Sequence, residues 1–138
     1  MGQRCVIAKA IGAWSFVLVA SLAAQPAKPT PQAEAAKLKN PVPSNAASIS
    51  TGQQLFQKYC RFCHGATGAG DSPSAPKDMK PSNLTDAAWD RGSTDGEIFI
   101  VIQEGAGPEY KMKGLKGKIS DTDTWNLVHF VRSLGGVK

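Results

Sequence analysis

Aromatic side chains are scarce in this chain, at 7% of its 138 residues. A small hydrophobic core with so few rings would need help from a group that is not protein. The three cysteines are an odd number, which argues against a simple disulfide framework. Charged residues, at 20%, are too few for a disordered acidic or basic tail, and the sequence has no internal repeat. This composition excludes a multi-domain enzyme, a multi-span membrane protein and a collagen-like chain.

Long apolar runs are also missing. The run over residues 10–20 is shorter than the roughly 20 residues that a membrane-spanning helix needs. Basic residues precede this run, and the small residues Ser21 and Ala23 follow it two positions apart, as signal peptidase requires. We therefore predict that residues 1–24 are an export signal, or a membrane anchor if they are not cleaved. Cleavage would remove Cys5 and leave two cysteines.

Residues 25–48 are rich in proline and alanine and carry almost no large apolar side chains. Because proline breaks helices and nothing here fills a core, we predict a linker over 25–48 and a folded domain over 49–138. That domain has 11 lysines and arginines against 10 aspartates and glutamates, a net charge of +1. It also lacks a basic stripe interleaved with aromatics, so we expect no nucleic-acid partner.

Helix caps predict three helices in the domain. Each cap is a serine or threonine followed three residues later by glutamine, glutamate or aspartate. The pairs are Ser50 and Gln53, Thr94 and Glu97, and Ser120 and Asp123.

Glycines mark where two of these helices end, Gly105 for the second and Gly135 for the third. A short helical turn is expected around residues 85–90. Strand-like alternation is absent, and the stretches 65–82 and 106–119 are loops rich in glycine, proline and lysine. The sequence thus predicts an all-α domain whose loops are long enough to wrap around something.

The most informative motif is Cys-Arg-Phe-Cys-His at residues 60–64. Cys60 and Cys63 share one face of a helical turn, so both thiols can add to the vinyl groups of a haem while His64 reaches the iron. This pattern is typical of c-type haem attachment, which takes place outside the cytoplasm and so agrees with export.

Other uses of this motif are weaker. A thioredoxin-like dithiol would need a βαβ context, which the sequence does not show. A structural zinc site needs four ligands, and only His129 is left to complete one. A disulfide would leave the adjacent histidine without a role.

Further motifs surround the attachment site in a fixed order. They are a Gly-x-x-x-Phe first helix, a proline-containing loop ending in Asn-Leu-Thr-Asp at 83–86, the segment 92–98, a methionine-containing loop and a last helix over 125–134. In this order the chain resembles the small bacterial class I cytochromes c, which have one haem. The resemblance implies an all-α, compact cytochrome c fold, with three main helices and a short one around one covalently bound haem c. Electron transfer is that family's usual function.

The resemblance also implies an axial methionine on the loop before the last helix. Met112 fits this place, so the implied iron ligands are His64 and Met112, although Lys113 stands where the family usually has proline. Met79 lies earlier, and we expect it to be an exposed loop residue.

A loop proline carbonyl supports the axial histidine in this family, and the nearest match is Pro81. Ser82 is the alternative, because the spacing to Leu84 is one residue longer than usual. Family likeness also implies a helix crossing in which Gly52 lets the backbones approach and the rings of two phenylalanines, Phe56 and Phe130, lock them.

Three residues have side chains suited to haem propionates, namely Trp89, Arg91 and Trp125, since indole N–H and guanidinium groups donate well to carboxylates. Plain packing is the alternative for each of them. His129 is expected to face solvent rather than to bind a metal.

With two axial ligands the iron would have no open site, so we predict a carrier of single electrons and not an enzyme. If Met112 did not bind, a five-coordinate sensor or a peroxidase-like enzyme would result. A third alternative is a subunit whose haem serves one fixed complex.

Lysines cluster around the ligand loop, with no acidic residue between Lys111 and Ser120. The cluster consists of Lys111, Lys113, Lys116 and Lys118. Such a surface favours weak, salt-dependent docking onto an acidic redox partner. We expect a monomer in the periplasm, tethered to the membrane if the signal segment is retained.

Overall fold

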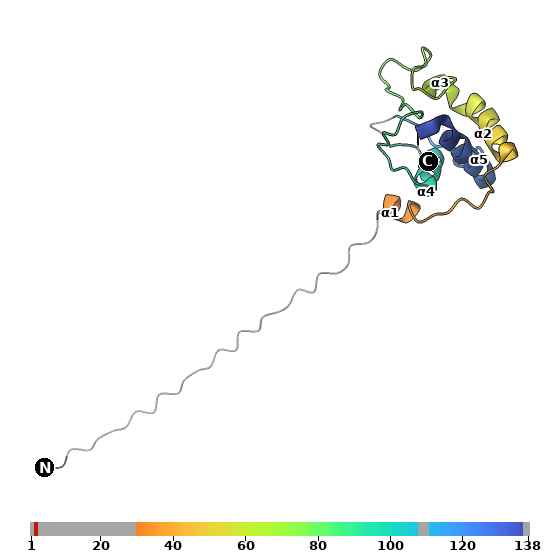
Figure 1. The fold of residues 1–138 in the computed structure, drawn as a ribbon. Coiled ribbons are helices and arrows are strands. Elements are labelled where there is room, and N and C mark those ends of the chain that lie inside the picture. The colour runs from red at the N-terminus through yellow and green to blue at the C-terminus, as the bar shows by residue number, and fades with distance from the viewer. Residues whose placement is uncertain (1, 3–29, 108–110, 137–138) are drawn as a thin grey trace.

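The computed structural model describes residues 2, 30–107 and 111–136. Within these residues five α-helices follow one another (Figure 1). They are α1 (Pro31–Ala35), α2 (Ala46–Tyr59), α3 (Arg61–His64), α4 (Asp95–Glu104) and α5 (Asp121–Val131), and an irregular turn over Arg132–Gly136 follows α5. The described residues form no β-strand, and their only β structure is a pair of isolated bridges, so the predicted all-α class is confirmed. None of the helices in this part of the chain has the length and apolar character needed to span a membrane.

The central contact is the crossing of α2 and α5, which lie side by side in Figure 1. A Cβ on Gly52 would lie 2.1 Å from the Asn126 carbonyl oxygen, so only glycine permits this approach. The rings of Phe56 and Phe130 pack beside it with centroids 5.1 Å apart and planes inclined at 53°. The predicted helix crossing is therefore present. The core continues from it to α4 through Ile98, Ile102, Leu127, Val128 and Val131.

Two of the three predicted N-caps are correct. The Thr94 hydroxyl accepts a hydrogen bond from Glu97 N at 3.2 Å, and the Glu97 carboxylate accepts from Thr94 N at 2.9 Å. Ser120 caps α5 in the same way by accepting from Asp123 N at 3.0 Å. These side chains satisfy backbone donors that a helix start leaves free.

The predicted start of the first helix is wrong, because α2 begins before Ser50. Asn45 Oδ1 accepts from Ser48 N at 2.9 Å, and Ser48 Oγ accepts from Asn45 N at 3.0 Å. This reciprocal capping box lies five residues upstream and leaves Ser50 inside the helix.

The predicted helical turn at residues 85–90 is also wrong, since only bends and turns occur there. Asn83 Oδ1 accepts from Thr85 N, and Asp86 Oδ1 accepts from Ala88 N, each at 2.9 Å. Such local side-chain bonds hold the backbone in turns and compete with helix formation.

Residues 30–45 form a strap across the domain, although the sequence predicted part of a linker there. A Cβ on Gly96 of α4 would lie 1.9 Å from the Ala35 carbonyl oxygen, so α1 touches the α4 backbone. Further along, Asn40 Nδ2 donates to the Trp125 carbonyl at 3.2 Å. The strap has few large apolar side chains, and backbone contacts and amide hydrogen bonds hold it instead.

The strap also changes the place of His129. Its Nε2 donates to the Val42 carbonyl at 2.8 Å, and the residue is only 9% exposed. The prediction that His129 faces solvent is wrong, because the strap covers this part of α5.

Candidate haem-binding site

A cavity of about 670 Å³ opens beside the core. Its walls come from α3 and the end of α2, from the loop 76–92, from one side each of α4 and α5, and from the loop 111–118. The lining is mainly apolar and includes Phe56, Leu84, Ile98, Ile102, Leu115 and Leu127. Parts of both loops that the sequence predicted to wrap around a non-protein group, within 76–82 and 111–118, line this cavity.

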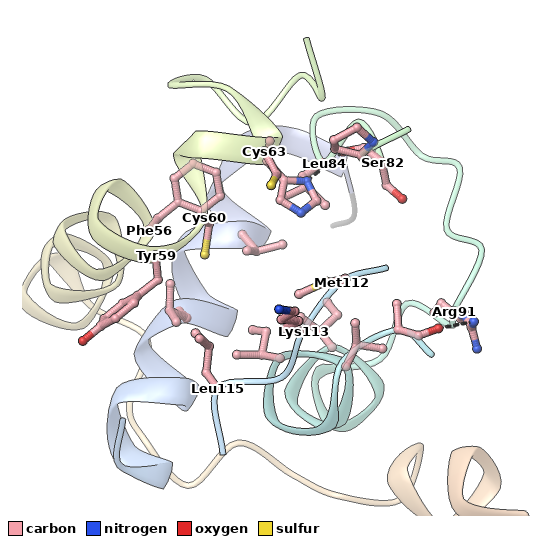
Figure 2. Close-up of a pocket in the computed structure, with 18 of the residues that line it drawn as sticks. Phe56, Tyr59, Cys60, Cys63, Ser82, Leu84, Arg91, Met112, Lys113 and Leu115 are labelled. Carbon is pink, nitrogen blue, oxygen red and sulfur yellow. Dashed lines mark hydrogen bonds between the residues drawn. The ribbon is translucent and has the colours of Figure 1, made fainter. Parts of the chain in front are cut away.

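The attachment motif forms the tight turn between α2 and α3. His64 N donates to the Cys60 carbonyl at 2.9 Å, which closes the short helix α3. Both thiols are free and point into the cavity from the same side (Figure 2). Burial, with a smaller effect of Cys63, raises the pKa of Cys60 to about 12, so this thiol is neutral at physiological pH.

His64 is oriented by a backbone carbonyl of the facing loop. Its Nδ1 donates to the Ser82 carbonyl at 3.0 Å, which leaves Nε2 for a metal. Burial lowers the pKa of His64, and the bond to Ser82 opposes this effect. The neutral imidazole that iron ligation requires is therefore favoured.

The prediction that the Pro81 carbonyl supports His64 is wrong. The carbonyl of Ser82, the alternative, supports it instead. The Pro81 carbonyl faces Gly70 instead, where a Cβ would lie 2.4 Å from that oxygen. The one-residue longer spacing to Leu84 moves the supporting carbonyl by one position.

Met112 lies across the cavity from the two cysteines (Figure 2). Its carbonyl accepts from Ala106 N at 3.1 Å and packs against Gly105, where a Cβ would lie 2.4 Å away. Lys111 precedes it with a φ of 54°, which is uncommon for a residue with a side chain. Met79 also lines the cavity and is half-buried, so the expectation that it is exposed is wrong.

The three predicted propionate donors separate into two groups. Trp89 and Arg91 line the cavity, and the buried Trp89 Nε1 has no hydrogen-bond partner among the described residues. Arg91 Nη2 donates to the Ala106 carbonyl. Trp125 is different: its indole stacks on Phe99 at 4.0 Å in the core and does not line the cavity, so the prediction for Trp125 is wrong.

The charged residues that line the cavity are mostly basic. Apart from Arg91, they are Lys58, Lys80, Lys111, Lys113, Lys118 and the acidic Asp90. Two lysines of the predicted cluster are in ion pairs, Lys111 with Asp78 and Lys116 with Glu104. Their acidic partners lie in other parts of the chain, so the local sequence over residues 111–120 does not reveal them.

Comparison with known proteins assigns the family. The family model described as cytochrome C oxidase, cbb3-type, subunit III matches residues 47–131. The chain belongs to this cytochrome c family. Its members carry covalently bound haem c, in agreement with the motif at residues 60–64.

A curated relative is the Cbb3-type cytochrome c oxidase subunit FixP of Rhizobium meliloti (strain 1021). It is 32% identical over 94 residues, which cover 68% of this chain and 30% of the relative. The chain thus spans under a third of the length of that relative.

Two solved structures are similar. A chain of the Kuenenia stuttgartiensis reducing HAO-like protein complex is 26% identical, with a TM-score of 0.62, over 72% of this chain and 48% of the other. Cytochrome CL of Methylophaga aminisulfidivorans is 22% identical, with a TM-score of 0.55, over 65% of this chain and 57% of the other. The predicted cytochrome c fold and the family resemblance are confirmed.

Proposed function

We propose that this protein carries single electrons through one haem c, attached to Cys60 and Cys63 and ligated by His64 and Met112. The observation that carries the proposal is that these four side chains line one largely apolar cavity, with Met112 across from the thiols (Figure 2). The chain has a single Cys-x-x-Cys-His motif, which supports one haem.

The cavity fits such a group. Its apolar walls suit a macrocycle, and the buried Trp89 Nε1 is a hydrogen-bond donor with no acceptor among the described residues. An indole N–H buried without a partner is costly, and a propionate carboxylate would satisfy it. We assign Trp89 and Arg91 to the propionate side of the cavity.

The bound haem supplies a reversible Fe(III)/Fe(II) couple, and the chain sets the conditions for it. Ser82 holds the His64 ring through Nδ1 and so presents Nε2. The Met112 thioether favours the reduced state and raises the potential. With both ligands in place no coordination site is open, which favours electron transfer over catalysis.

Docking would use the lysines that line the cavity. Lys113 and Lys118 make no ion pair in the described part of the chain, so they carry more of the attraction than Lys111 and Lys116. Phe62, 60% exposed, adds an apolar contact beside the cysteines. This surface suits brief docking of an acidic redox partner. We propose an exported, periplasmic monomer, tethered to the membrane if the N-terminal segment is retained.

A second candidate function is a fixed subunit of an oxidase. The relative's name, Cbb3-type cytochrome c oxidase subunit, favours it. The two candidates differ in how the protein is isolated from its source. A carrier elutes as a monomer, whereas a fixed subunit copurifies with oxidase activity in detergent extracts.

Absorption spectra test the ligand assignment. In wild-type protein matured with haem we expect a low-spin ferric spectrum with a weak sulfur-to-iron band in the near-red. Met112→Ala should lose that band and bind carbon monoxide when reduced, while Met79→Ala, the matched control, should keep the wild-type spectrum. A high-spin wild-type spectrum would favour the sensor or peroxidase-like alternative, and the absence of covalent haem would refute the proposal.

A further inference from the structure

The strap contacts the haem site through Gln32 of α1. Its Nε2 donates to the Arg91 carbonyl, and its side chain also bonds the Glu97 carboxylate. The pKa of Glu97 is lowered mainly by the Thr94 backbone N–H and to a smaller extent by Gln32. Gln32 therefore joins the loop that carries Arg91 to the start of α4.

The position of α1 is fixed independently of this contact. Thr30 Oγ1 accepts from Ala33 N at 3.2 Å and caps the helix. The missing side chain of Gly96 makes room for the Ala35 carbonyl on the other side. Gln32 is thus presented to Arg91 by a capped helix whose end rests on the backbone of α4.

Hydrogen bonds continue from Gln32 to the ligand loop. Arg91 Nη2 donates to the Ala106 carbonyl, and Ala106 N donates to the Met112 carbonyl at 3.1 Å. Three bonds in series therefore connect the strap with the backbone of Met112. The family match begins at residue 47, so the strap lies outside the matched region.

We propose that Gln32 is a positioning residue for the axial ligand: through Arg91 and Ala106 it holds the Met112 loop closed. The inference rests on the proposed function, because it takes Met112 as the ligand. Asn40 serves as the contrast, since it fastens the other part of the strap to the Trp125 carbonyl and has no bond to this series.

Imidazole is a suitable probe, because it binds ferric iron only when Met112 dissociates from the iron and its loop moves. The full chain with haem would be titrated as wild type, Gln32→Met, Asn40→Ala and Gln53→Met. Gln32→Met keeps the size of the side chain and removes the donor, and Gln53→Met makes the same change at an exposed position of α2. We expect imidazole to bind Gln32→Met about fivefold more tightly than wild type, the factor for one typical hydrogen bond. The other two variants should stay within twofold of wild type.

Three results would overturn or separate the claims. An affinity of Gln32→Met within twofold of wild type would show that the strap does not act on the ligand loop. An equal rise in Asn40→Ala would show general loosening of the domain rather than positioning. After either result, a low-spin wild-type spectrum with the sulfur-to-iron band would still support the proposed function. A high-spin wild-type spectrum would refute both the proposed function and the role of Gln32.

Discussion

The crossing of α2 with α5 and the loops that wall the cavity are packed in opposite ways. At the crossing, Gly52 and the Asn126 carbonyl approach so closely that one methyl group has no room. At the cavity, about 670 Å³ lies open between helices and two loops, which hydrogen bonds such as those from His64 to Ser82 and from Leu115 N to the Ile102 carbonyl hold in place. Protein alone completes the first region, and the second needs a cofactor to fill it. Substitutions should therefore separate into those that cost stability and those that change redox properties.

Gly52→Ala should have the largest effect on folding. Its Cβ would meet the backbone of α5, which cannot move without opening the core, so we expect the free energy of unfolding to fall by about 3 kcal/mol. Denaturant unfolding of the haem-containing protein measures this loss. Gln53→Ala, on an exposed neighbour, should change it by less than about 0.5 kcal/mol. A Gly52→Ala protein as stable as this control would contradict the packing account.

Gly96→Ala tests how firmly the strap is packed against α4. The added Cβ would clash with the Ala35 carbonyl as severely as at Gly52, but the strap is a peripheral segment that is able to shift. We expect a loss of about 1 to 2 kcal/mol, smaller than for Gly52→Ala. Limited proteolysis should cut the strap of this variant faster than that of wild type. A loss equal to that of Gly52→Ala would mean that the strap belongs to the core.

Trp89→Phe should change the redox property with little effect on folding. It keeps an aromatic ring in the cavity wall and removes the Nε1 donor that we assign to a propionate. A less compensated carboxylate favours ferric iron, so the reduction potential should fall by roughly 20 to 40 mV, the equivalent of a weak hydrogen bond for one electron. Potentiometric titration measures the shift. An unchanged potential would place the propionates elsewhere.

Charge changes among the lysines around the cavity should have the smallest effects. Oxidation of the ferrous protein by the anion ferricyanide at low ionic strength should slow about twofold in Lys113→Ala. Lys116→Ala makes the same change of net charge at a lysine that pairs with Glu104 and does not line the cavity. It should slow the reaction less. Equal rates for both variants would show that the lysines lining the cavity do not steer anions.

The sequence predicted the parts of this molecule that local patterns determine. The caps at Thr94 and Ser120, the attachment motif and the crossing at Gly52 each depend on residues close in the chain or on a recognisable order. Ser82 lay one position from the predicted Pro81, because a backbone carbonyl has no sequence signature of its own.

The remaining features depend on contacts between distant segments. The strap has no apolar periodicity, and Gln32 meets Arg91 across 59 positions. The burial of His129 depends on that same strap, and two lysines form ion pairs with acids outside their own loop. Such pairings arise from the fold and leave no mark on the local pattern.

The central claim is that the loops of this chain hold one His/Met-ligated haem for reversible electron transfer. A potentiometric titration of the wild-type protein, with haem counted per chain, tests it most directly. The account predicts one haem per chain and a single reversible one-electron transition, with a ferrous form that does not bind carbon monoxide at neutral pH. A ferrous form that binds carbon monoxide readily, or a transition that is not reversible, would contradict it.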